Sequence, residues 1–151
     1  MALLVIVVLS LWLLASLQET EERTEKLLVE LAVRRMRTGL QLAQGEAMMR
    51  GREREIANWV GLNPTRWLDG ALQGYAGYCG RRSELAAGAW CYDAVFGELL
   101  YRPRLHQHLR LKNGGDVPLL SWKVVAENPT AQDGMVGLQV KNVTPYEWFA
   151  E

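Results

Sequence analysis

The chain lacks any surplus of charge, because its 17 lysine and arginine residues are balanced by 17 aspartate and glutamate residues. A protein without excess positive charge has no general attraction for a phosphate backbone, which argues against nucleic-acid binding. The sequence also contains no P-loop, G-x-G-x-x-G, G-x-S-x-G or H-E-x-x-H pattern. We therefore predict no enzymatic activity, no cofactor and no small-molecule substrate.

Charge is absent altogether from residues 2–17, and every charged side chain lies from Glu19 onward. As a helix, this apolar run is about 24 Å long, somewhat shorter than a hydrocarbon core of about 30 Å. A cleaved signal peptide has an apolar run of similar length. However, no lysine or arginine precedes this one, and Ala15-Ser16-Leu17 is a poor small-x-small cleavage site. We expect residues 1–18 to be a retained, single-pass apolar helix.

Cysteine is scarce, with Cys79 and Cys91 as the two residues of this type. Neither belongs to a C-x-x-C pair, so the common zinc and thioredoxin spacings are excluded. A bridge between them would close a loop of about a dozen residues and contribute roughly 3 kcal/mol in the chain-entropy model. The alternative is a pair of reduced, buried cysteines in a cytosolic protein. The apolar N-terminus favours export, so we predict a disulfide and a head on the oxidising side of the membrane.

Proline is absent before Pro64, and residues 19–57 are rich in good helix formers. Apolar residues recur there every three or four positions, which places them on one face of a helix. This pattern predicts an amphipathic helix over residues 19–58, continuous with the apolar run to about Ala57. The stripe is expected to pack on the chain's own sheet, and packing on other copies is a compatible second interpretation. A bend or break is expected at Gly39, Gly45 or Gly51.

Residues 59–151 carry turn residues and short strand-like segments with no helix between the later ones. Residues 58–64 end the helical pattern, and residues 65–88 have the composition of a loop. This arrangement predicts an α+β fold, with the long helix packed on a small antiparallel sheet. The expected strands are Ala89–Tyr92, Glu98–Tyr101, Leu105–Lys112, Leu119–Ala126 and Met135–Val143.

Few side chains suggest chemistry. His106 and His108 share one face of the expected strand 105–112, but no acidic residue or cysteine accompanies them locally, so we predict no metal site. Asp93 and Glu98 could form an acid pair, although ordinary surface charges are the simpler interpretation. Six tryptophans are more informative: Trp59, Trp67 and Trp90 are expected to fasten the loop and helix to the sheet, and Trp148 to cover a sheet edge or dock a partner.

An apolar run that merges into a long amphipathic helix, followed by a Gly-rich loop and an antiparallel sheet, resembles the type IV pilin-like superfamily. That superfamily includes pilus subunits and the pseudopilins of type II secretion. The segments Asn58–Pro64, Ala89–Asp93 with Glu98–Arg102, and Val136–Val143 followed by Trp148 are similar to minor pilins or biogenesis proteins of mannose-sensitive-haemagglutinin-type systems.

The chain departs from this family at two points. Pilin precursors carry a short basic leader, and none precedes the apolar run, so Met1 is expected to begin either a processed or a never-processed subunit. Family members usually have a glutamate at mature position five, where this chain has Val5. A subunit without that carboxylate is more typical of a minor or accessory component than of a major pilin.

The resemblance implies a structural or assembly subunit of a pilus-like or secretion-like filament. It would sit in the bacterial inner membrane with a periplasmic head, in contact with membrane lipid and with other pilin-like subunits or assembly proteins. The alternatives are a single-pass accessory that binds the pilus machinery and a membrane-anchored extracytoplasmic enzyme. The residues expected to pack helices together are Val5, Ile6, Val8, Leu9, Trp12, Leu13, Val29, Val33, Met36 and Leu40.

Overall fold

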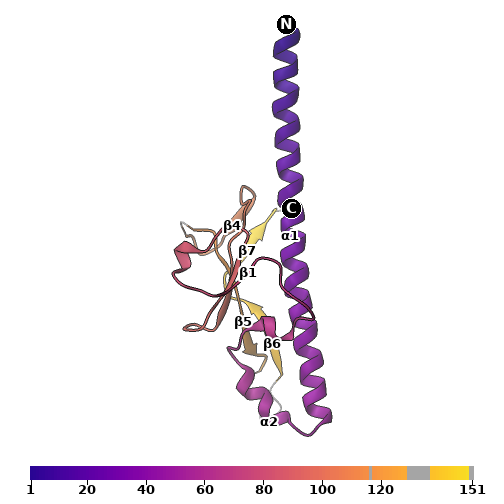
Figure 1. The fold of residues 1–151 in the computed structure, drawn as a ribbon, viewed down its shortest axis with the longest axis vertical. Coiled ribbons are helices and arrows are strands. Elements are labelled where there is room, and N and C mark those ends of the chain that lie inside the picture. Colours follow the sequence, from indigo (N-terminus) through magenta and orange to yellow (C-terminus); the bar gives the residue numbers. More distant parts are fainter. Residues whose placement is uncertain (116, 129–136, 150–151) are drawn as a thin grey trace.

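A single helix, α1 (Ala2–Met49), forms the long axis of the molecule. The computed structural model describes residues 1–115, 117–128 and 137–149. The first half of α1 projects alone beyond the head, and the second half packs along it (Figure 1). Good helix formers and the absence of proline allow the helix to run without interruption across the boundary between the apolar and charged segments.

The helix ends earlier than the expected limit near Ala57. Gly51 adopts a left-handed conformation with φ of 69°. The Gly51 N–H donates to the Met48 carbonyl, and the Arg52 N–H donates to the Ala47 carbonyl at 2.8 Å. These two bonds form a Schellman motif, which glycine favours because it has no Cβ. The chain then makes one short helical turn, α2 (Glu53–Ile56), and two 3₁₀ turns, η1 (Ala57–Trp59) and η2 (Pro64–Trp67).

The main sheet has five strands in the order β1-β2-β3-β5-β6. The strands are β1 (Tyr75–Tyr78), β2 (Trp90–Asp93), β3 (Glu98–Tyr101), β5 (Leu120–Ala126) and β6 (Leu138–Asn142). The pairings from β2 to β6 are antiparallel, as predicted. The predicted start of the last strand, residues 135–136, lies outside the described residues.

The sheet departs from the prediction at its edge, because β1 pairs with β2 in parallel. Residues 75–78 were expected to be loop, and they have no alternation of apolar and polar side chains that would mark a strand. Their conformation depends on the partner strand and on the chain returning through residues 79–89. That return includes the 3₁₀ turn η3 (Arg82–Glu84). The α+β class is therefore correct, but the sheet is mixed.

A second, two-stranded sheet joins β4 (Leu109–Leu111) to β7 (Tyr146–Trp148) beside α1. The strand expected over residues 105–112 is shorter in the structure because Leu105 and His108 donate their backbone N–H groups to carboxylates of α1 instead of to a neighbouring strand. Trp148 is buried in β7. It packs in the core, and its indole N–H donates to Glu22 of α1.

The core lies between one face of α1 and the sheet. Val29, Val33, Met36 and Leu40, here called the inner stripe, are buried against Trp122, Val124 and Val140 of the sheet and their neighbours. Gly39 allows η2 to approach closely, since a Cβ on this residue would overlap the Trp67 carbonyl oxygen. Gly39 lowers the helix propensity of this segment, but a residue without a Cβ is required at the point where η2 crosses α1.

Candidate functional site

The first candidate surface is the apolar half of α1. Every residue from 2 to 17 is exposed, including all six predicted packing residues of this segment, Val5, Ile6, Val8, Leu9, Trp12 and Leu13. An 18-residue window of this helix is apolar and long enough to cross a membrane by length and composition, and none of that window is buried. The segment cannot be stabilised by the chain's own core and requires either lipid or another protein.

The four predicted packing residues of the second half have a different environment. Val29, Val33, Met36 and Leu40 form the inner stripe and are turned toward the sheet. In this fold they are therefore not available at the surface for a second copy. The contact that they make is with the chain's own head.

A second apolar strip runs along the opposite side of α1. Leu17, Leu28, Leu31 and Leu42 are exposed, and we call them the outer face. Successive helix residues are about 100° apart, which places this face roughly opposite the inner stripe. Beyond the polar residues 18–26, this face again presents apolar side chains at the level of the head. The periodicity analysis, which followed a single stripe, did not predict these exposed leucines.

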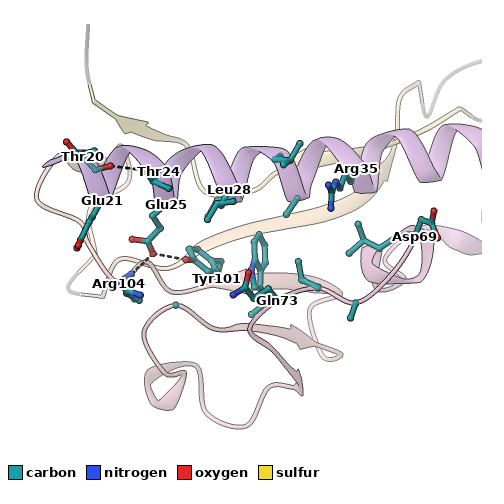
Figure 2. A pocket seen from close by; sticks show the side chains of 18 residues that line it. Thr20, Glu21, Thr24, Glu25, Leu28, Arg35, Asp69, Gln73, Tyr101 and Arg104 are labelled. Atoms are coloured by element: carbon teal, nitrogen blue, oxygen red, sulfur yellow. Dashed lines mark hydrogen bonds between the residues drawn. The ribbon is translucent and has the colours of Figure 1, made fainter. Parts of the chain in front are cut away.

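A half-open groove of about 640 Å³ lies between the outer face and the head (Figure 2). Leu28 and Leu31 line one wall, and residues 68–73 with Trp90 and Tyr101 line the other. Glu21 and Arg35 lie along the same groove, also on α1. The groove combines apolar side chains with the carboxylates of Glu21, Glu25 and Asp69 and with the guanidinium groups of Arg35 and Arg104.

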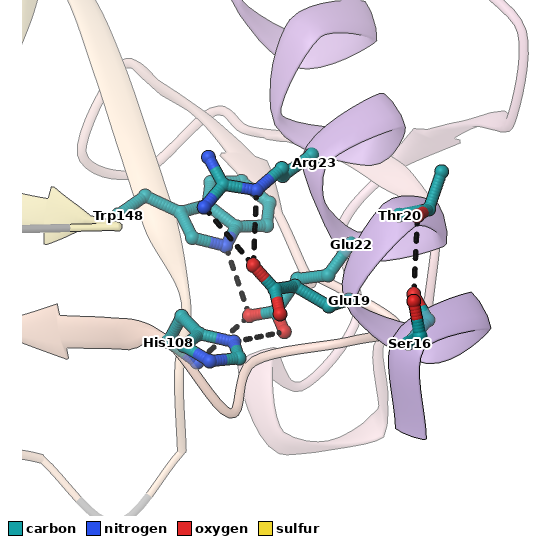
Figure 3. A network of polar contacts seen from close by, with 7 residues as sticks. All are labelled: Ser16, Glu19, Thr20, Glu22, Arg23, His108 and Trp148. Atoms are coloured by element: carbon teal, nitrogen blue, oxygen red, sulfur yellow. Dashed lines mark hydrogen bonds and ion pairs between the residues drawn. The ribbon is translucent and has the colours of Figure 1, made fainter. Parts of the chain in front are cut away.

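A buried carboxylate fastens the head to α1 where the helix leaves it. Glu22 is only 2% exposed. It accepts hydrogen bonds from the His108 N–H at 2.8 Å and from the Trp148 indole N–H at 3.1 Å, and it contacts the His108 Nδ1 at 2.8 Å (Figure 3). Phe149 stacks on His108 and lies under the Arg23 guanidinium, which covers the cluster.

The electrostatics of Glu22 follow from these contacts. Burial by itself raises the pKa of the Glu22 carboxyl, but the hydrogen bonds from the His108 side chain and backbone and from Trp148 favour the charged form more strongly. The net pKa is lowered from its usual value. The carboxylate therefore stays ionised at neutral pH and acts as a fixed acceptor for groups from two distant segments.

Glu25, one helical turn further along, holds the neighbouring loop (Figure 2). Its carboxylate accepts hydrogen bonds from the Tyr101 hydroxyl at 2.6 Å and from the backbone N–H groups of Arg104 and Leu105 at 2.6 and 3.0 Å. Burial, together with the hydrogen bond to Glu25, raises the pKa of Tyr101. The hydroxyl thus stays protonated and acts as a donor.

A disulfide and a cluster of ion pairs hold the part of the head around strands β1, β2 and β3. Cys79 and Cys91 are bonded, with a Cα–Cα distance of 5.0 Å, as predicted. Arg82 bridges Asp93 at 2.9 Å and Glu98 at 3.0 Å. Burial raises the pKa of Asp93, but the hydrogen bonds from Arg82 and from the backbone outweigh this effect and lower it. The two carboxylates that could have formed an acid pair are therefore bound to one arginine.

His108 was expected to lie in the strand over residues 105–112. It lies immediately before β4, where its side chain is exposed on one side and contacts the buried Glu22 on the other. Within the described residues, no group of three or more His, Cys, Asp and Glu side chains is arranged to hold a metal ion. Glu22 and Glu25 escaped the sequence reasoning because their partners lie 76 to 126 residues away. One signal was present: Glu22 lies seven residues before Val29, in phase with the inner stripe.

No family model, curated protein or solved structure matches the chain. The shape is compatible with the pilin-like plan in its coarse features, namely a long N-terminal apolar helix over a small sheet with a disulfide.

Proposed function

We propose that this protein is a structural or assembly subunit of a filament of the type IV pilus or type II secretion kind, as a minor pilin or biogenesis component. The observation that carries the proposal is the exposed apolar surface of α1. This surface covers residues 2–17 and resumes beyond the polar residues 18–26 with Leu28, Leu31 and Leu42 of the outer face beside the head. Exposed apolar side chains both in the membrane segment and at the level of the head suit helix-to-helix packing better than simple tethering.

The proposed location follows from the same features. Residues 2–17 would lie in the bacterial inner membrane before assembly, and the head would lie in the periplasm. The Cys79–Cys91 bond supports an oxidising compartment, because disulfides rarely persist in a reducing cytosol. The partners would be other pilin-like subunits or proteins of the assembly machine.

The mechanism is packing without catalysis. Apolar helices associate through dispersion and close side-chain contact, and Ser10 and Ser16 supply small positions of the kind that helices use in lipid. Residues 2–17 carry no charged side chain. Association of this segment should therefore not depend on a carboxylate–amine pair and should vary little with salt concentration.

Replacement of residues 2–17 by a Leu/Ala helix of equal length tests the proposal. Two copies with different affinity tags are co-expressed, extracted in mild detergent and purified through one tag. The native pair should co-purify, whereas the replaced pair should lose most of its co-purification although it remains in the membrane fraction. Val95→Ser, in an exposed position of the head, is the control and should behave as the native chain does. Unchanged co-purification after replacement would mean that the segment is only a tether, as in a single-pass accessory protein.

A further inference from the structure

Three charged residues interrupt the outer face of α1, namely Glu21, Arg35 and Glu46. Glu46 pairs with Arg50 at 2.9 Å. Among the described residues, no ion pair involves Glu21 or Arg35. Both side chains are exposed and line the groove beside the head (Figure 2). Two opposite charges therefore lie on the outer face among its exposed leucines and threonines, and no ion pair within the described chain involves them.

Their spacing is regular. Glu21 and Arg35 are fourteen residues apart, which corresponds to about four helical turns and about 21 Å along the axis. The same step relates Leu17 to Leu31 and Leu28 to Leu42 on the outer face. Thus a shift of fourteen residues superimposes leucine on leucine and brings the acidic position onto the basic one.

We propose that a second copy of this chain docks its α1 in the groove, parallel to the first helix and shifted by fourteen residues. In this register Arg35 of one copy meets Glu21 of the other, and Leu42 of one copy packs on Leu28 of the other. The inference rests on the proposed function and adds the identity of the partner surface and its register.

Charge selects this register over its alternatives. Unshifted parallel helices would bring Glu21 onto Glu21 and Arg35 onto Arg35, and such like-charge contacts oppose pairing. An antiparallel pair would also match the charges, but it would direct the apolar halves of the two copies toward opposite ends of the complex. Copies that start in one membrane with the same orientation cannot adopt that arrangement. The leucines supply the contact area, and the ion pair sets the alignment, as exposed ion pairs generally do.

The shifted contact does not close on itself. It joins different residues of the two copies, so each copy retains one unused half of the interface. Glu21 of the shifted copy comes to lie beside the apolar half of the first, where an unpaired carboxylate is unfavourable. Arg35 of a third copy, shifted by the same step, would neutralise it. The pairing therefore favours continued addition of copies over a closed dimer.

Cysteine cross-linking between two differently tagged full-length copies in mild detergent tests the register. Leu28 and Leu42 are exposed, so each can be replaced by cysteine, and the native cysteines are already bonded to each other. The mixed pair, in which one copy carries Leu28→Cys and the other carries Leu42→Cys, should cross-link about fivefold more than either like pair, in which both copies carry the same substitution. This ratio is expected if the charges contribute about 1 kcal/mol to the register. Glu21→Arg or Arg35→Glu alone should remove that preference, and the double exchange should restore it.

A third variant, Leu9→Cys in the exposed apolar half, is cross-linked in the same way to distinguish the remaining outcomes. Predominant Leu28→Cys like pairs would overturn the register and leave the proposed function standing, since the copies would still associate. Cross-linking through Leu9→Cys alone would also overturn the register and leave the proposed function standing. Failure of all three positions would overturn both the register and the proposed function. A mixed-pair preference that survives Glu21→Arg would show that the charges do not set the alignment.

Discussion

The two halves of α1 belong to one continuous helix but have opposite relations to the rest of the chain. Residues 2–17 are exposed all round, and Leu9 retains 58% of its accessible surface. In the second half the inner stripe is buried, and Leu40 retains 1%. Both halves are apolar enough to stabilise a protein by burial, but only the second half does so within the chain. Apolar composition thus predicts a need for burial without identifying what provides it.

The difference between the two halves of α1 should be largest for one leucine of each half, Leu40 and Leu9. Leu40→Ala should destabilise the head by about 2–5 kcal/mol, because it leaves a cavity in a packed core. Leu9→Ala should change the stability of the head by less than about 0.5 kcal/mol, because no head residue packs on it. Thermal unfolding of the full chain in detergent, followed by the near-ultraviolet signal of the head tryptophans, measures both. Equal losses would mean that residues 2–17 contact the head in solution.

The boundary between the halves is tested at Glu22. Glu22→Ala leaves two N–H donors and the His108 ring without their acceptor and should destabilise the head by about 3 kcal/mol. Glu46→Ala removes an exposed contact with Arg50 and should change stability by less than about 1 kcal/mol. Chemical denaturation of the detergent-solubilised variants provides the comparison. A loss for Glu22→Ala no greater than that for Glu46→Ala would show that the cluster does not hold the head to the helix.

Two glycines of the second half separate tertiary contact from helix propensity. Gly39→Ala should destabilise the protein by about 1–3 kcal/mol, since the new methyl group meets the Trp67 carbonyl. A methyl group at Gly45 would meet no neighbouring atom within 4 Å, so Gly45→Ala should stabilise the helix by up to about 1 kcal/mol. The same melting experiment should therefore shift in opposite directions for the two variants. Stabilisation by both would place η2 away from the helix.

The smallest expected effect is the acid dependence. The pKa of Glu22 is lowered in the folded protein relative to 4.5, so the unfolded chain takes up the proton first as the pH falls. The stabilisation that ionised Glu22 provides is complete above about pH 4.5 and is lost progressively as the pH falls below that value. Glu22→Gln should flatten the decline in melting temperature between about pH 5 and pH 3, by the amount expected for about one ionisable group. An equally steep decline for Glu22→Gln would assign the acid sensitivity to other carboxyls.

The sequence was sufficient for features that depend on local pattern. The four-and-three spacing of Val29, Val33, Met36 and Leu40 predicted both the helix and its buried side, and the spacing of Cys79 and Cys91 predicted their bond. Patterns of this kind repeat within a few residues or close a short loop, so they are visible without the fold.

The features that were missed depend on distant partners. Strand β1 exists because Tyr75–Tyr78 lies beside β2, and its own residues do not alternate. The bonds of Glu22 to His108 and Trp148 cross 86 and 126 residues of chain. The helix is terminated by the Schellman motif at Gly51, one of three glycines at which a break was expected. Local spacing does not distinguish Gly51 from Gly39, which lies inside the helix where a Cβ would overlap the Trp67 carbonyl.

The positions of Glu22 and Glu25 have a mechanical consequence. If the apolar half of α1 is held and the head is pulled away, the load passes from the helix to the head near these two residues before it reaches the inner stripe. Their carboxylates hold the 104–108 segment and Trp148 together, so several hydrogen bonds must yield at once before the head can peel from the helix. A strong attachment at this end of the contact protects the core behind it, and the head should resist tension best when Glu22 is ionised.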